Sequence, residues 1–144
     1  MGTANESKYI DWIEEMLKYI GYKTFREVIP DECKDWKYPY RVDLIFFKTP
    51  DKIYGMEAKS ISSYRQAVPL SKAVVQIRKY RQLHYNTKTI REWCLSVDCR
   101  YKYNWNAEIK TFFDFYLWKT DKISVLHGGE YSVSLMKGKE VERL

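Results

Sequence analysis

The sequence predicts an α/β domain in which a mixed sheet is flanked by helices, and two observations carry this prediction. Apolar side chains recur at helical spacing in two segments, and short apolar segments bounded by turn residues lie between and after them. The expected order is α-β-β-β-α-β, followed by extra C-terminal strands. The chain of 144 residues is expected to form a single domain over residues 1–144, long enough for a core without disulfide bonds.

The first half of the chain is expected to supply one helix and three strands. In residues 5–20 the apolar positions follow helical spacing, and Gly21 ends the helix. The strands expected next span residues 22–29, 40–48 and 52–60. The polar segment 31–39 forms a loop, and Thr49-Pro50-Asp51 forms a tight turn.

The second half is expected to begin with a helix and continue with strands. The helix spans residues 70–85, and its apolar side consists of Leu70, Ala73, Val74, Ile77 and His84. Residues 92–99 form the next strand. Further strands are expected at residues 112–118, 123–126 and 131–136, and Gly128-Gly129 indicates a hairpin between the last two.

The composition excludes several classes of protein. No apolar stretch approaches the roughly 20 residues of a membrane helix, and the first residues do not resemble a signal peptide, so we expect a cytoplasmic protein without a membrane partner. Three cysteines (Cys33, Cys94 and Cys99) are too few for a disulfide framework or a four-cysteine metal site. The net charge of +6 permits a nucleic-acid partner. The aromatic fraction of 17% mainly indicates an aromatic-rich core, with base stacking as the lesser alternative.

Three residues of the second and third predicted strands bring charged side chains to one face of the sheet. If these strands pair as a hairpin about Pro50, residues equally distant from Pro50 lie opposite each other, and Asp43 then faces Glu57. Lys59 lies two residues beyond Glu57 and points to the same face. The same Glu-x-Lys spacing recurs at residues 32–34 and 108–110. We do not expect an active site at either copy, because the first lies in a loop and no strand with an acidic residue precedes the second.

Facing carboxylates repel each other unless one keeps its proton or a cation lies between them. A cluster of hard oxygen ligands favours Mg²⁺ or Mn²⁺. Beside such a cation, Lys59 would orient a water molecule or help to deprotonate it, as in metal-assisted phosphodiester hydrolysis. A surface hairpin with a cross-strand ion pair explains the same three residues equally well.

The helix predicted at residues 70–85 adds polar and basic side chains. Gln76 and Tyr80 are four residues apart and share a stripe beside the apolar side, which directs Gln76 toward Glu57 and Lys59. A glutamine bound to solvent is the simpler alternative for Gln76 taken alone. The helix also carries basic residues that would neutralise phosphates or remain solvated, namely Lys72, Arg78, Lys79 and Arg81.

Taken in order, these motifs resemble the PD-(D/E)XK nuclease superfamily. Arg41-Val-Asp43 and Met-Glu57-Ala-Lys59 resemble its strand–turn–strand motif, and Gln76-x-x-x-Tyr80 is similar to the helix motif of RecB-type nucleases. The segment from Gly21 to Leu44 also resembles the N-terminal nuclease domain of type I restriction subunits. The resemblance covers roughly residues 6–99 and implies a restriction-endonuclease-like core.

The resemblance also implies a metal site and a water-activating lysine. Asp43 and Glu57 would bind the metal ion together with the carbonyl group of Ala58. Lys59 would act on the attacking water or stabilise the developing charge. Val42 stands where many members have proline, and the four cysteines of the iron–sulfur members are missing.

Helical residues would complete this implied site. Gln76 would hold the metal site or a water molecule, and Tyr80 would contact the scissile strand or support Gln76. Many members also carry an acid on the first helix. Glu6 is the first candidate for this acid because it begins the stripe that continues with apolar residues, and Glu14 is the second.

The sequence therefore predicts a nuclease that hydrolyses DNA phosphodiester bonds with Mg²⁺ or Mn²⁺ as cofactor. One alternative is a nucleic-acid-binding protein that keeps the fold without cleaving its ligand. Another is an assembly module in which residues 112–118 form a subunit interface. A homodimer is left open by the sequence.

Overall fold

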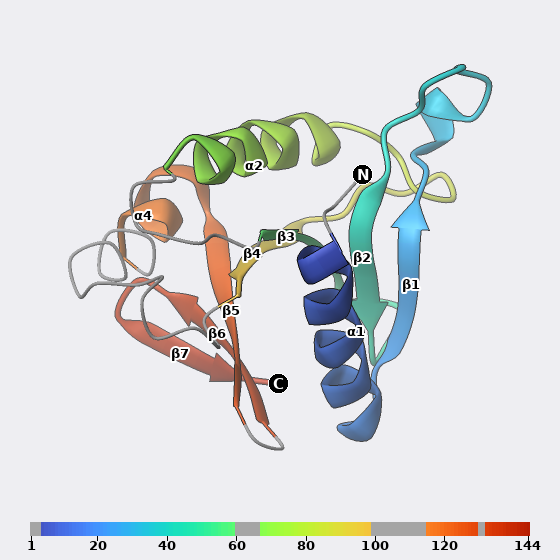
Figure 1. Cartoon of the computed structure of the whole chain (residues 1–144). Coiled ribbons are helices and arrows are strands. Elements are labelled where there is room, and N and C mark those ends of the chain that lie inside the picture. Colours follow the sequence, from blue (N-terminus) through green and yellow to red (C-terminus); the bar gives the residue numbers. More distant parts are fainter. Residues whose placement is uncertain (1–3, 60–66, 99–114, 130–131) are drawn as a thin grey trace.

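The computed structural model describes residues 4–59, 67–98, 115–129 and 132–144, and the statements below refer to these residues (Figure 1). A seven-stranded sheet has its strands in chain order. The strands are β1 (Lys23–Val28), β2 (Val42–Phe47), β3 (Ile53–Lys59), β4 (Glu92–Val97), β5 (Ile123–Gly129), β6 (Ser132–Lys137) and β7 (Glu140–Arg143). The helices are α1 (Ala4–Tyr19), α2 (Ala67–Tyr80), α4 (Leu117–Asp121) and the short 3₁₀ helix η1 (Asp31–Cys33).

The strand directions confirm the predicted mixed sheet with flanking helices. β1, β2 and β3 pair antiparallel, β3, β4 and β5 pair parallel, and β5, β6 and β7 pair antiparallel again. Parallel neighbours require a crossover connection, and α2 lies in the crossover from β3 to β4. The hairpin predicted from Gly128-Gly129 is confirmed by the antiparallel pairing of β5 with β6.

Each face of the sheet buries its own apolar layer. On one face, Ile13 and Leu17 of α1 belong to a buried cluster with Leu44 and Met56. On the other face, Ala73 and Ile77 of α2 belong to a buried cluster that also contains Trp93 and Leu95 of β4. The first helix therefore buries Ile13 and Leu17 of its predicted stripe, and the second buries Ala73 and Ile77 of its own.

The sheet curls around α1, which lies between its two wings in Figure 1. Trp12 of α1 packs so closely on β5 that a Cβ atom at Gly128 would lie 2.8 Å from its ring. From the far edge, Glu142 of β7 accepts a hydrogen bond of 2.7 Å from Lys52, which precedes β3. Twist accumulated over seven strands allows such distant strands to meet.

The register of the β2–β3 hairpin agrees with the prediction. Leu44 lies opposite Met56 and Phe47 opposite Ile53, so residues equally distant from Pro50 are paired. The N–H of Lys52 donates to the carbonyl group of Thr49 over 3.3 Å and closes the turn. The paired register ends at Leu44 and Met56, and Asp43 and Glu57 are the next residues on the two strands, at the end of the hairpin away from the turn.

The second helix begins and ends earlier than predicted. It spans Ala67–Tyr80 instead of residues 70–85 and includes Pro69, whose missing N–H is tolerated in a first turn. After Tyr80 the chain turns, and the Tyr85 hydroxyl donates to the Tyr80 carbonyl over 2.9 Å. The prediction that His84 lies on the apolar side of the helix is therefore wrong, because His84 is exposed and bonds Glu32.

Two further predictions are corrected near the C-terminus. Of the strand predicted at residues 112–118, residues 112–114 lie outside the described residues, and residues 115–118 are helical. The strand β7 was not predicted, because four mostly polar residues at a sheet edge give no clear alternation. None of the helices in the described ranges has the length and apolar character needed to span a membrane.

Candidate active site

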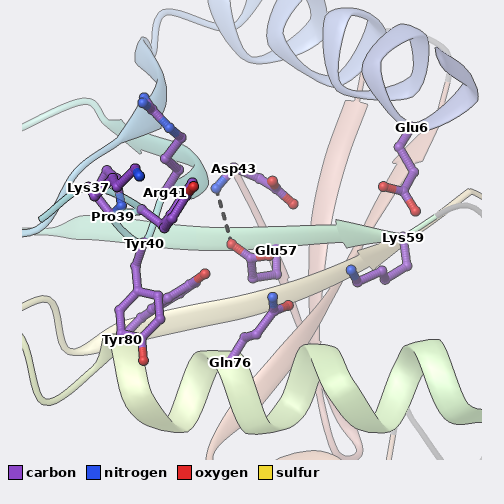
Figure 2. Close-up of a pocket in the computed structure, with 11 residues that line it drawn as sticks. Glu6, Lys37, Pro39, Tyr40, Arg41, Asp43, Glu57, Lys59, Gln76 and Tyr80 are labelled. Carbon is purple, nitrogen blue, oxygen red and sulfur yellow. Dashed lines mark hydrogen bonds between the residues drawn. The ribbon is translucent and has the colours of Figure 1, made fainter. Parts of the chain in front are cut away.

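A cavity of about 440 Å³ lies at the end of the β2–β3 hairpin, between α1 and α2 (Figure 2). The cavity brings together six residues that the sequence singled out: Glu6, Asp43, Glu57, Lys59, Gln76 and Tyr80. In Figure 2, the loop before β2 closes one end of the cavity, whereas Glu6 and Lys59 lie at the other. Residues from α1, β2, β3 and α2 therefore share one site.

The two predicted acids are held against each other by backbone hydrogen bonds. The N–H of Asp43 donates to Glu57 Oε1 over 3.1 Å, and the N–H of Ala58 donates to Asp43 Oδ2 over 2.8 Å. Each strand thus fixes the carboxylate of the other. Glu57 is only 3% exposed, so this pair is not a solvated surface feature.

Burial makes the negative charge of this pair costly. It raises the pKa of Glu57 well above its ordinary value, and the neighbouring charge of Asp43 raises it further. Burial also raises the pKa of Asp43, against the lowering effect of the Ala58 N–H and of the Lys59 charge. In the absence of a cation, Glu57 therefore tends to keep a proton at a pH where an exposed glutamate is ionised.

Gln76 and Tyr80 reach the acids from α2. Figure 2 shows Gln76 directed toward Glu57, and its buried Oε1 atom has no hydrogen-bond partner among the residues that the structure describes. The Tyr80 ring is buried between Tyr40 and Trp93, at centroid distances of 5.8 Å and 6.2 Å. Burial raises the pKa of the Tyr80 hydroxyl, as do the charges of Glu57 and Asp43. Tyr80 therefore stays neutral beside the acid pair.

The structure separates the two candidate acids of the first helix. Glu6 lines the cavity, and its charge contributes to the raised pKa of Asp43. Glu14 instead accepts a hydrogen bond from Thr24 and pairs with Arg26 over 3.5 Å, so it faces β1. The first-helix acid of the cavity is therefore Glu6.

The basic residues predicted to contact nucleic acid do not line the cavity. Arg78 forms two hydrogen bonds of 2.8 Å and 2.9 Å with the Asp121 carboxylate, and Arg81 donates to the Asp121 carbonyl group over 2.7 Å. Both arginines are thus joined to α4. Lys72 is exposed, and the ammonium of Lys79 lies 6.0 Å from the centre of the Tyr40 ring.

Sequence reasoning missed the loop that precedes β2. The cavity is also lined by the consecutive residues Lys37, Tyr38, Pro39, Tyr40 and Arg41. The sequence predicts only a polar loop and the start of a strand for these residues, apart from Arg41, which belongs to the strand motif. The signal in the sequence is the alternation of basic and aromatic residues around Pro39, beside the strand that carries Asp43.

The residues of the cavity fit a hard divalent cation. Within the described ranges, no group of three or more His, Cys, Asp or Glu side chains converges as a metal-binding cluster. The acid pair would therefore need further oxygen donors, and the partnerless Gln76 Oε1 is one that lines the same cavity. Two carboxylates and an amide oxygen are the donor types that Mg²⁺ and Mn²⁺ prefer.

No family model and no curated protein sequence matches this chain. Among solved structures, it is similar to SPO1766, a protein of unknown function from Silicibacter pomeroyi, with a TM-score of 0.48 and 17% identity over 92% of this chain and 69% of that one. It is also similar to AF1548, another protein of unknown function, with a TM-score of 0.46 and 12% identity over 81% of this chain and 55% of that one. The site is therefore interpreted from its own geometry.

Proposed function

We propose that the protein is a Mg²⁺- or Mn²⁺-dependent nuclease that hydrolyses DNA phosphodiester bonds, with a restriction-endonuclease-like core of the PD-(D/E)XK type. One observation carries the proposal. Two carboxylates, the buried Glu57 and the partly buried Asp43, face each other across a hairpin. Lys59 and Gln76 line the same cavity, and the Gln76 Oε1 atom has no hydrogen-bond partner among the described residues. The alternative interpretation, a cross-strand ion pair at the surface, explains neither why Glu57 is buried nor why a second acid lies beside it.

The arrangement of elements supports the same proposal. A helix precedes three antiparallel strands, and a second helix connects the third strand to a parallel fourth one. This is the α-β-β-β-α-β order that the resemblance implies. The acids lie on the second and third strands and Gln76 on the second helix, as the motif order requires.

The side chains of the cavity have distinct roles in the proposed reaction. Asp43 and Glu57 would hold the cation with Gln76, and the cation would supply Lewis acidity at the phosphate and lower the pKa of a bound water. Lys59 would orient the attacking water and offset negative charge on the phosphate. Glu6, on the side of Lys59, would accept a hydrogen bond from this water or help to bind a cation.

Cleavage of labelled DNA tests this proposal directly. We expect cleavage with Mg²⁺ or Mn²⁺ and none in chelator, measured on single-stranded, blunt-ended and branched substrates. Glu57→Ala and Lys59→Ala should each lower the rate by orders of magnitude, while their melting curves remain cooperative. Glu140→Ala and Lys119→Ala change exposed residues outside the cavity and should leave the rate unchanged.

Undiminished cleavage by Glu57→Ala would overturn the assignment of the site. Binding of DNA without cleavage under any metal condition would instead favour the non-catalytic alternative.

A further inference from the structure

The loop between η1 and β2 presents aromatic rings to solvent beside the acid cavity. Tyr38 is 80% exposed and Trp36 is 50% exposed. Tyr38 also lines the cavity that contains Asp43 and Glu57, so an exposed ring adjoins the acids. Two exposed rings that lie two residues apart beside a polar cavity are in a position to contact a ligand bound there.

Side-chain contacts fix the 3₁₀ helix η1, which leads into this loop. At its start, the Asp31 carboxylate accepts the N–H groups of Asn86 and Thr87 over 3.1 Å and 2.7 Å. Glu32 bonds both the backbone N–H and the ring of His84, each over 2.9 Å. Because these contacts already order the start of the loop, the loop loses less conformational entropy when a ligand binds.

The exposed rings are connected to the core by a series of aromatic contacts. The Trp36 ring meets the Tyr40 ring edge-on at a centroid distance of 5.5 Å, and Tyr40 in turn contacts Tyr80 at 5.8 Å. Because Tyr80 is buried against the sheet, Trp36 stands on a rigid support. A rigid, exposed ring is suited to stacking on a flat ligand.

Cationic groups accompany the rings. The ammonium of Lys37 lies 5.4 Å from the centre of the Tyr38 ring. Lys37 and Arg41 line the cavity, and Lys79 reaches the Tyr40 ring from α2. The loop therefore combines aromatic faces with positive charge, and Asp35 is the acid that stands among them.

We propose that this loop binds a single-stranded segment of DNA and directs it into the acid cavity. Bases stack on Tyr38 and Trp36, and the phosphate groups between them are neutralised by Lys37 and Arg41. The combination of stacking rings and a cationic groove is the general means by which proteins bind unpaired strands. For the role of the bound strand as a substrate, this inference rests on the proposed function.

Double-stranded DNA cannot make the stacking contacts that this loop offers. The bases of a duplex stack on one another, so their faces are closed to protein rings unless the strand is opened. The cavity of about 440 Å³ also falls within the range of small-ligand pockets, on the order of 300–1,000 Å³. Such a cavity receives a nucleotide extended from a single strand more readily than a base-paired stack.

Fluorescence anisotropy with labelled oligo(dT) tests this inference in chelator, where no cleavage takes place. Wild-type protein should bind the single strand more tightly than a blunt duplex of the same length. Tyr38→Ala should weaken binding of the single strand by about ten-fold or more, and Trp36→Ala should have a similar effect. Tyr38→Phe keeps the ring and should bind nearly as well as wild type. Tyr19→Ala removes a ring that is 71% exposed at the opposite end of α1 and serves as the matched control.

The two proposals fail in different ways. Equal affinity for the single strand and the duplex, or unchanged affinity of Tyr38→Ala and Trp36→Ala, would overturn the inference even if the protein cleaves DNA. Ring-dependent binding of the single strand, with no cleavage under any metal condition, would support the inference as a binding function and overturn the nuclease proposal.

Discussion

At the scale of single residues, the acid pair makes the cation-free protein sensitive to pH. Burial raises the pKa of both Glu57 and Asp43, and the charge of Asp43 raises the pKa of Glu57 further, so the folded protein keeps protons that the unfolded chain releases. Stability therefore decreases as the pH rises from the ordinary carboxyl range, near pH 4, toward the raised pKa values. The full loss of stability is reached only at a pH above the raised pKa values that the two carboxyl groups have in the folded protein.

Glu57→Gln removes the ionisable group and keeps an oxygen that can accept the Asp43 N–H. In chelator, we expect this variant to melt at or above the wild-type temperature at pH 8. The difference should shrink as the pH falls toward 4.5, because wild-type Glu57 then loses its charge. Calorimetry across this pH range measures it, and a difference that does not vary with pH would contradict the raised pKa.

Asp43→Asn tests whether the two acids share a cation. A ligand that binds only the folded state stabilises it by RT ln(1 + [L]/Kd), about 2.7 kcal/mol at a hundredfold excess over Kd. Mn²⁺ should therefore raise the melting temperature of the wild type, and Asp43→Asn should lose most of this rise. The variant should melt at or above the wild type in chelator, because one repelling charge is gone. An equal response to Mn²⁺ in both proteins would show that the acids do not hold the ion together.

At the scale of elements, the Trp93 ring of β4 packs directly on Gly55 of β3, where a side chain would clash. A Cβ atom at Gly55 would lie 2.4–2.7 Å from three ring atoms of Trp93, which is 1% exposed. The fully buried ring has no room to withdraw. This contact anchors the parallel pair at the end away from the cavity.

Gly55→Ala should lower the free energy of unfolding by about 1–3 kcal/mol, the usual cost of overpacking a core. Denaturant titration measures this loss. In a Trp93→Leu background the same substitution should cost less, because the clashing ring is gone. A cost that is equal in both backgrounds would exclude the Trp93 contact as the cause.

Two basic surfaces are expected to contribute differently to DNA binding. One is the loop before β2, and the other is the outer face of α2, defined here as Arg78 and the following Arg81. Asp121 already binds Arg78 and Arg81, whereas Lys37 and Arg41 line the cavity. The affinity for a single strand falls with salt by about 0.7 in logarithmic slope for each neutralised phosphate. The loop residues should therefore dominate this slope.

The double variant Lys37→Ala/Arg41→Ala should reduce the salt slope by about 1.4 with little change in melting temperature. The double variant Arg78→Ala/Arg81→Ala should instead lower the melting temperature, because it releases α4, and change the slope less. Anisotropy titrations over a range of NaCl concentrations compare the two. The reverse result would assign DNA binding to the outer face of α2.

At the scale of the whole molecule, Glu142 connects the last strand to the beginning of the third. It pairs with Lys52 over 2.7 Å and with Lys137 over 2.6 Å. Burial alone would raise the pKa of Glu142, but the hydrogen bonds and charges of Lys137 and Lys52 outweigh it and lower the pKa to about 2. The curled sheet is thus stabilised by an ionised carboxylate.

This contribution is present above the ordinary glutamate pKa and is lost as the pH falls toward about 2. Glu142→Gln should therefore lower the melting temperature at pH 7, and the difference from wild type should diminish between pH 5 and pH 3. Glu140→Gln changes an exposed acid on the same strand and should have little effect. A difference for Glu142→Gln that is constant down to pH 3 would contradict a role for its charge.

Local patterns in the sequence were sufficient for the elements that carry the acids. Short apolar segments bounded by turn residues placed β2 and β3, and the tight turn at residues 49–51 set their register. A strand register follows from turn geometry and from which face is buried, and both are encoded within a few residues. The same reasoning chose Glu57 over the acid at Glu32, which the structure places on η1 with His84.

Only the tertiary structure decided which distant residues meet at the cavity. Glu6 and Glu14 have similar local sequence settings, but the crossing of α1 over the sheet brings Glu6 to the acids and Glu14 to β1. Likewise, the sequence left open whether Arg78 neutralises a phosphate or remains solvated, whereas in the structure Asp121 of α4 binds it.

The sequence by itself therefore determined the order of the elements from α1 to β4 and the acid pair, because periodicity, turns and hairpin register are short-range properties of the chain. The curl of the sheet around α1, the basic and aromatic loop at the cavity, and the partners of the arginines were decided by the tertiary structure. Each of these features depends on contacts between residues far apart in sequence. Such contacts follow from how complete helices and strands pack, and no local pattern specifies them.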